Sequence, residues 1–424
     1  MKRKVAEIAR LATKKSKDLQ SGLQPGSKSA FVIFPNCLFS DLSNFETHNY
    51  DSIFLVEEPM FFGHDKLRPY NINKIKLAWL RACMKSYFSV LQAKLGSQCI
   101  YVDYDEVQSY QFLSGYTVSL YDPVDYELET KLASFSIKYH KFESLLFLVP
   151  TTTIKDYFET KKGNKRIIQN HFYEWIKKEL DVLTNVRSTD SENRQTLPKS
   201  HKLKWKTPSF NVGSDLKYYK EARDWVDSHH LFKDNIGDTS KLHLYPINED
   251  GAKLQFTDFL ENRAKEFGPY EDAIDKNEVV LFHSFISAPL NNGLLSPKWA
   301  LDSIMKAKGH IPMNSLEGWV RQLTWREYQR SIYVCYFDDL RSANHFGHSN
   351  KLNWEVWYGR KSTNMEILDN ELKKALSHGF AHHIPRLCIF LNMFNLLEVQ
   401  LDDVVRWFSE VIAMDAYPWV NSFK

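Results

Sequence analysis

Two adjacent histidines, His382 and His383, stand just before Arg386 near the end of a 424-residue chain. Imidazole titrates near neutral pH, so a histidine can donate and retake a proton during a reaction. On a helix, adjacent side chains point about 100° apart, whereas His383 and Arg386, at i and i+3, share a face. A zinc pair normally uses positions i and i+4, so this spacing predicts no metal site. Taken alone, the pair is more simply interpreted as ordinary surface or core histidines.

A second group of polar residues precedes a leucine-rich turn that ends at Ser296-Pro297. Ser284 and Ser287 lie three residues apart in this segment. Closely spaced hydroxyls and backbone N–H groups at a helix start can bind phosphate oxygens. Simple helix capping is the alternative that the segment alone favours.

A third group combines aromatic rings with an amide and a guanidinium. Trp319, Gln322, Trp325 and Arg326 follow one another at i, i+3, i+6 and i+7, which places Trp319, Gln322 and Arg326 on one helical face. Such a set can hold a stacked base or a flavin–adenine nucleotide. The alternative is a packing stripe with an arginine that reaches to solvent.

Composition narrows the class of protein. Hydrophobic residues make up 43% and aromatic residues 14% of the chain, which excludes general disorder. The net charge of +3 neither demands nor excludes a nucleic-acid partner.

The five cysteines are scattered without a CxxC pair, which indicates buried thiols in a reducing compartment and no zinc or redox pair. No apolar run approaches the ~20 residues of a membrane span, so no membrane is expected. Nucleus, cytoplasm and organelle are not distinguished.

Residues 1–28 form a basic N-terminal tail, with seven lysines and arginines against one acid in its first 17 residues. A targeting helix, a nuclear signal, a DNA-touching arm and a frayed tail all fit this pattern.

Residues 29–150 alternate apolar runs with helical periodicity. Strands are expected at 29–39, 52–58, 98–103 and 144–149, and helices at 73–95 and 125–137. Strands that alternate with helices predict a parallel sheet in an α/β, Rossmann-like domain. No GxGxxG follows the first strand, so the dinucleotide-binding fingerprint is missing.

Residues 151–215 are predicted to be a connector, with a helix at 170–184 and a polar linker at 186–215. Residues 216–424 show helical periodicity almost throughout and predict an all-α domain. Its expected helices span 257–267, 269–278, 297–307, 315–334, 364–380, 381–397 and 401–415.

This order of domains and motifs resembles the photolyase/cryptochrome flavoproteins, in particular the iron–sulfur bacterial branch, the deoxyribodipyrimidine photolyase-related proteins. The resemblance runs from about residue 30 to 420. The matching motifs are Phe267-Gly-Pro-Tyr-Glu-Asp-Ala-Ile274, Leu281–Pro297, Glu317–Tyr328, Ala381–Leu387 and Asp415-Ala-Tyr-Pro-Trp419, together with Val56–Gly63 and Asp122–Tyr126 in the first domain.

The resemblance implies an antenna-type α/β domain, a long linker and a helical FAD-binding domain. It assigns Tyr270, Ser284, Ser287, Arg326, Arg386 and Asp415 to the flavin. It places Trp319, Gln322 and Trp325 against the DNA lesion. It implies that His383, with His382 beside it, is the proton donor, and that Trp357 and Trp407 pass electrons to FAD.

The function implied is light-driven repair of UV-damaged DNA by electron transfer from reduced FAD, with (6-4) pyrimidine lesions favoured. One alternative is a cryptochrome-like blue-light sensor without repair activity. Another is an inactive, C-terminally truncated remnant, or one half of a split protein whose missing segment comes from a separate polypeptide.

The chain departs from the family at the iron–sulfur cluster. Ile367 stands where the first ligand cysteine is expected, and the other three ligands belong to a segment beyond the DAYxW motif. Thiolates are the ligands of such clusters, so no iron–sulfur cluster is expected. A lumazine antenna is considered near Glu57–Arg81. Phe408 replaces a tyrosine that commonly follows the second electron-transfer tryptophan.

Overall fold

The computed structural model describes residues 28–107, 109–160, 168–201 and 206–421. Apart from Lys28, the predicted basic tail lies outside the described residues. No helix in the described ranges is long and apolar enough to cross a membrane.

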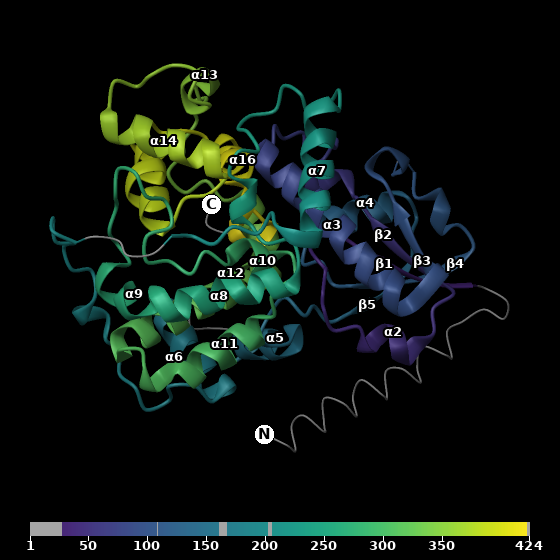
Figure 1. Ribbon diagram of the computed structural model, residues 1–424, viewed down its shortest axis with the longest axis horizontal. Coiled ribbons are helices and arrows are strands. Elements are labelled where there is room, and N and C mark those ends of the chain that lie inside the picture. The colour runs from purple at the N-terminus through teal and green to yellow at the C-terminus, as the bar shows by residue number, and fades with distance from the viewer. Residues whose placement is uncertain (1–27, 108, 161–167, 202–205, 422–424) are drawn as a thin grey trace.

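Within these ranges, five strands form one parallel sheet in the order β3-β2-β1-β4-β5 (Figure 1). The central strand pairs with β2 on one side and with β4 on the other. All five residues of β2 are buried, because both faces of a parallel sheet are covered by other elements. The strands are β1 Lys28–Ile33, β2 Ser52–Val56, β3 Cys99–Val102, β4 Tyr116–Tyr121 and β5 Tyr139–Phe142.

The predicted strand at 144–149 is wrong, and β4 and β5 were missed. The apolar residues of 144–149 pack against side chains instead of pairing in the sheet. The ring centroids of Phe147 and Trp419 lie 5.4 Å apart. The Arg330 guanidinium lies 4.7 Å from the Phe147 ring. The segment is therefore apolar because it meets the helical part of the chain, and apolar runs alone do not distinguish these cases. The first strand also ends at Ile33, earlier than the predicted residue 39.

The predicted helix at 73–95 is confirmed as α3, Lys74–Leu95, with Asn73 as its N-cap. The Asn73 side chain accepts a hydrogen bond from the Ile75 N–H at 3.2 Å and donates one to the Leu376 carbonyl at 2.7 Å. The predicted helix at 125–137 forms α4, Tyr126–Ser134, capped by Asp125.

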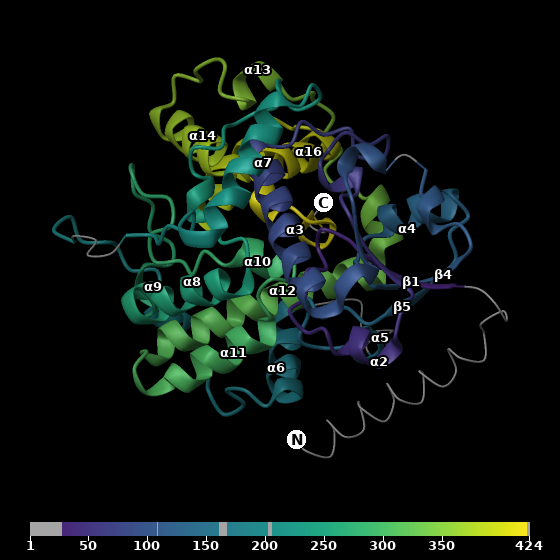
Figure 2. The same ribbon diagram turned by 45° about the vertical axis from the view of Figure 1, so that its right-hand side comes forward.

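Helix α3 lies between the sheet and the helical part of the molecule, beside α7 Leu216–Ser228, in both views (Figures 1 and 2). Residues on both sides of α3 are buried. The Trp79 indole donates a hydrogen bond to the Pro246 carbonyl at 2.8 Å. The core that contains the sheet continues into Tyr219 and Val226 of α7, so packing crosses the predicted domain boundary.

The other helices of the described residues complete the chain. They are α2 Ser43–His48, α5 Thr151–Glu159, α6 Gln169–Leu180, α8 Glu249–Asn262, α9 Ala264–Tyr270, α10 Ser287–Asn291, α11 Pro297–Lys306, α12 Met313–Ser342, α13 Trp354–Trp357, α14 Glu366–His378, α15 Asn392–Leu396 and α16 Leu401–Val411.

Three predicted helices differ from the structure in part or in whole. The helix predicted at 257–267 is interrupted at Arg263, where α8 ends and α9 begins. No helix spans 269–278, since α9 ends at Tyr270 and the chain continues as turn and loop. The predicted helix at 381–397 is confirmed from His383 to Leu396, although Pro385–Leu391 form a π-helix within it. Ala381 and His382 lie just before the helix, and Ile384, directly before Pro385, has helical φ and ψ of −69° and −52°.

We predict that Asn73→Ala lowers the free energy of unfolding by about 1–2 kcal/mol, because the variant loses the α3 cap and its bond to Leu376. Urea unfolding followed by circular dichroism measures the change. Asn353→Ala is the matched control, since Asn353 is also an N-cap residue but makes no capping hydrogen bond. Equal stability of the two variants would contradict the assignment.

Candidate functional site

A cavity of about 260 Å³ lies among four separate segments of the helical part. These segments are the stretch 283–291, one face of α12, residues 380–386 and the C-terminal Asp415. Nine of the residues singled out from the sequence line it: Ser284, Ser287, Trp319, Gln322, Arg326, His382, His383, Arg386 and Asp415.

Backbone strain shapes the first wall. Leu281 and Phe285 adopt left-handed conformations, with φ of 45° and 59°. Such geometry costs on the order of 1–3 kcal/mol for each bulky residue and persists only where packing enforces it. Both side chains are buried, and His283 and Ser284 between them reach the cavity. Helix α10 is only five residues long, so the phosphate site expected there depends on hydroxyls more than on a helix dipole.

The face of α12 that meets the cavity carries Trp319, Gln322 and Arg326. Arg326 Nε donates to Asn291 Oδ1 at 2.8 Å, and Nη2 donates to the Leu290 carbonyl at 3.2 Å. Burial lowers the pKa of Arg326 to about 10, which leaves the guanidinium charged at neutral pH. Trp325 does not line the cavity, because its ring packs 5.5 Å from that of Tyr328 on another side of the helix.

The two adjacent histidines have different surroundings. His382 is buried and stacks on His283 with ring centroids 4.5 Å apart. Burial, reinforced by the neighbouring His383, holds the pKa of His382 well below its ordinary value, so this ring is neutral at pH 7. His383 is partly exposed, and its Nε2 lies 3.0 Å from Oδ1 of Asp272. That hydrogen bond lowers the pKa of the Asp272 carboxyl.

An ion pair closes the opposite wall. Arg386 donates from Nη2 to Asp415, which also accepts a hydrogen bond from the Ser287 hydroxyl. The Arg386 Nε–H donates to the Ala381 carbonyl. Asp415 is buried, so this contact joins the π-helix, the C-terminal segment and α10 around the cavity.

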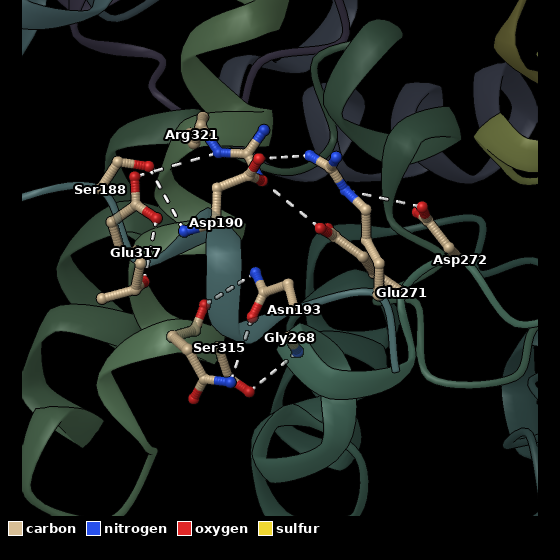
Figure 3. Close-up of polar contacts among 12 residues, drawn as sticks. Ser188, Asp190, Asn193, Gly268, Glu271, Asp272, Ser315, Glu317 and Arg321 are labelled. Carbon is tan, nitrogen blue, oxygen red and sulfur yellow. Dashed lines mark hydrogen bonds and ion pairs between the residues drawn. The ribbon is translucent and has the colours of Figure 1, made fainter. Parts of the chain in front are cut away.

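A polar network behind His383 holds Asp272 in place. Figure 3 shows Arg321 of α12 beside Asp190 and Glu271. The Arg321 Nη2 lies 2.7 Å from Asp190 Oδ1 and 3.5 Å from Glu271 Oε1. Asp190 also accepts a hydrogen bond from Arg194. The Arg194 Nε lies 3.7 Å from Asp272 Oδ2. The predicted polar linker therefore packs against the site over residues 190–194.

Besides Trp325, three more of the singled-out residues lie away from the cavity lining. Tyr270 packs against Phe282 with ring centroids 5.3 Å apart. Trp357 and Trp407 are buried together, with ring centroids 5.6 Å apart, and the Trp407 indole donates to the Trp357 carbonyl at 2.8 Å.

The family model of deoxyribodipyrimidine photo-lyase-related proteins matches residues 31–244, half of the chain. The chain belongs to this family. A (6-4) photolyase of Agrobacterium fabrum is 31% identical to this photolyase-related protein over 272 residues. That match covers 61% of this chain and 51% of the relative, so it spans about half of the relative's length.

Two solved structures show the same fold. A bacterial class III photolyase from Agrobacterium tumefaciens superposes with a TM-score of 0.58 at 18% identity, covering 95% of this chain and 79% of the other. The cryptochrome of Synechocystis sp. gives a TM-score of 0.61 at 16% identity, covering 94% of this chain and 82% of the other. The α/β sheet and the helical part of the photolyase-related protein thus have the arrangement expected from the motifs.

Asp272 and His283 were missed from the sequence, although both lie inside motifs noted there. His283 stands between the Leu281 and Ser284 positions of the second motif, and Asp272 follows Glu271 in the first. A histidine two residues from a strained position, or an acid next to another acid, carries no local signal of its role. Only the folded chain brings them to His382 and His383, from about 100 residues away.

A second cavity of about 460 Å³ lies where the segment Glu57–Arg81 meets α12, α16 and Tyr417. Met60, Arg68 and Lys76 line it. Lys76 is buried, and its Nζ donates to the Tyr417 hydroxyl at 3.0 Å. Burial lowers the pKa of Lys76 from 10.5 to about 7.

The lowered pKa of Lys76 predicts a pH-dependent stability. Between pH 7 and 10.5 the unfolded chain binds more protons than the folded one, so this group makes stability rise with pH, by up to about 1.4 kcal/mol per unit. We expect Lys76→Met to stabilise the protein more at pH 6 than at pH 9. The urea midpoints of the variant and the wild type across this pH range measure the difference in stability.

Lys85→Met, on the same helix but beside Asp103, should follow the wild-type curve. Parallel curves for Lys76→Met and wild type would contradict the assignment.

Proposed function

We propose that this photolyase-related protein is a flavin-dependent DNA photolyase that acts on (6-4) pyrimidine lesions. The observation that carries the proposal is His383, oriented by a carboxylate on the wall of the same cavity as Arg326 and the Arg386–Asp415 pair. A partly exposed histidine next to a charged cavity suits proton transfer to a bound substrate.

The cavity residues fit a flavin nucleotide. Ser284 and the Arg326 cation offer donors for phosphate oxygens, and Trp319 offers an aromatic surface, whereas the Ser287 hydroxyl already donates to Asp415. Buried nitrogen atoms of His283 and His382 have no hydrogen-bond partner in the protein, so the cavity has unused polar groups for a ligand. When bound and excited by light, reduced FAD supplies an electron to the damaged bases.

His383 is assigned the proton transfer to the lesion. Its Nε2 is held by the Asp272 carboxylate, which orients the ring and leaves Nδ1 for exchange with the substrate. Because His382 is neutral and buried, it packs behind the donor and does not compete for its proton.

Damaged DNA is the proposed partner. Enzymes that act on bases inside a duplex flip the nucleotide into a pocket, and the cost of unstacking is smallest for a damaged base. Trp319 and Gln322 offer a ring and an amide on the cavity wall for stacking and hydrogen bonding to such a base.

Trp357 and Trp407 are proposed to carry electrons toward the flavin. Their buried rings lie 5.6 Å apart, and indole rings in such contact can exchange an electron. Phe408 beside Trp407 is far harder to oxidise than tyrosine, so it is not assigned a step.

The second cavity is proposed to hold a lumazine antenna. Its wall combines aromatic rings of Tyr70 and Tyr333 with the Arg68 cation and the half-neutral Lys76, which suits a flat ligand with polar edges.

Two further proposals concern what the helical part binds. We propose that it carries no iron–sulfur cluster, because Ile367 offers no thiolate at the expected ligand position. We also propose that a separate polypeptide covers the π-helix and α15, where Leu387 and Leu396 are 53% and 67% exposed.

Light-dependent repair tests the proposed function. Reduced protein is illuminated with oligonucleotides that carry either a (6-4) lesion or a cyclobutane dimer, and the products are separated by chromatography. We expect loss of the (6-4) lesion only. His383→Asn should slow repair by about 10²–10⁴-fold, since it removes the proton donor.

His378→Gln is the matched control, because His378 lies on α14 outside the cavity and should repair at the wild-type rate. Flavin photoreduction without loss of either lesion would instead assign a light sensor. Equal repair by His383→Asn and wild type would contradict the role of His383.

A further inference from the structure

Three imidazole rings converge on the wall of the cavity. One ring nitrogen from each of His283, His382 and His383 lies within 4.8 Å of the other two. The rings of His283 and His382 stack at 4.5 Å, and His283 and His383 meet edge to face at 5.5 Å. His382 and His383 are adjacent in the sequence and supply two of the rings. His283, from a distant segment of the chain, supplies the third.

Two of these rings present unused nitrogen atoms. His283 Nε2 and His382 Nδ1 are buried and have no hydrogen-bond partner in the protein. His382 is only 5% exposed, so water does not readily replace the missing partner. An unsatisfied buried polar atom costs about 1–3 kcal/mol, and two such atoms side by side point to a shared ligand.

The cluster also has the outer partners that metal-binding histidines use. His383 is bonded through Nε2 to the Asp272 carboxylate, which leaves Nδ1 for an ion. The His283 ring is bonded to the Glu271 backbone, which leaves its Nε2. Metal-ligating histidines commonly donate their second N–H to a carboxylate or a carbonyl.

The protonation states agree with metal binding. Burial and the neighbouring imidazoles hold the pKa of His283 and His382 well below the ordinary value, so both are neutral at pH 7. Neutral imidazole is the form that binds a cation. Nitrogen ligands select zinc, copper or nickel over magnesium and calcium, which take oxygen ligands.

We propose that His283, His382 and His383 form a binding site for one divalent transition-metal ion, with Asp272 as the group that orients His383. Zinc bonds nitrogen at about 2.0–2.1 Å, so tetrahedral ligands lie about 3.4 Å apart, and the rings must close by about an ångström to bind it. Three protein ligands leave a fourth position open toward the cavity for water or an anionic group.

The site has a consequence for catalysis that rests on the proposed function. An ion on Nδ1 of His383 would occupy the nitrogen that faces the substrate, while the proton on Nε2 is held by Asp272. His383 would then have no proton to donate to the substrate. Zinc and lesion repair are therefore mutually exclusive, and zinc should inhibit repair. Metal binding itself is measured independently of repair, so failure of one proposal is distinguishable from failure of the other.

Cobalt(II) absorption and zinc calorimetry test the site on the purified full-length chain, after chelator treatment. We expect one ion per chain and visible cobalt bands typical of nitrogen ligands. His283→Leu and His382→Leu should each weaken zinc binding by more than about 100-fold. Asp272→Asn should weaken it by about 10–100-fold, the usual effect of losing an outer partner.

His378→Gln is again the control, since it removes a nearby histidine outside the cluster and should bind zinc as wild type does. Circular dichroism shows whether each variant is folded. If a leucine variant is unfolded, the cobalt spectrum of Asp272→Asn still decides. The proposal is overturned if wild type binds no stoichiometric ion, or if folded His283→Leu or Asp272→Asn binds zinc as tightly as wild type.

Discussion

The ion pair between the partly exposed Arg386 and the buried Asp415 holds the walls of the site together. Arg386 belongs to the π-helix that follows the histidine pair, and Asp415 belongs to the C-terminal segment and accepts a hydrogen bond from the Ser287 hydroxyl of α10. Removing Arg386 would leave the buried Asp415 charge without its cationic partner, which is destabilising. This contact therefore joins three segments around the cavity.

A second layer of polar contacts sets the orientation of His383, the proposed proton donor. Asp190, Arg194 and Arg321 connect the former linker to α12 and to Asp272, and Asp272 holds His383 (Figure 3). Gly268 permits the close approach behind this network, because a Cβ there would lie 2.8 Å from the Ser315 nitrogen. The chain thus places one histidine for chemistry through residues that a motif alone does not reveal.

Much of the arrangement was predictable from the sequence, and the exceptions have physical causes. Helix α3 was predicted from its helical period, and the shared face of Trp319, Gln322 and Arg326 follows from helical spacing. The strand at 144–149 was wrong because an apolar run indicates burial, not the element that buries it. Asp272 and His283 were missed because their partners are distant in sequence and no spacing encodes them. The absence of a metal site was inferred from two histidines alone, and the third ligand reopens that question.

The central claim is that this cavity binds a flavin, and one absorption spectrum tests it most directly. Protein purified in the dark should show the oxidised or reduced flavin bands at close to one flavin per chain. Asp415→Ala, if folded, should lose most of that flavin, because the wall formed by Arg386 and Ser287 would open. Folded wild-type protein that carries no flavin, and takes up none when FAD is added, would contradict the account.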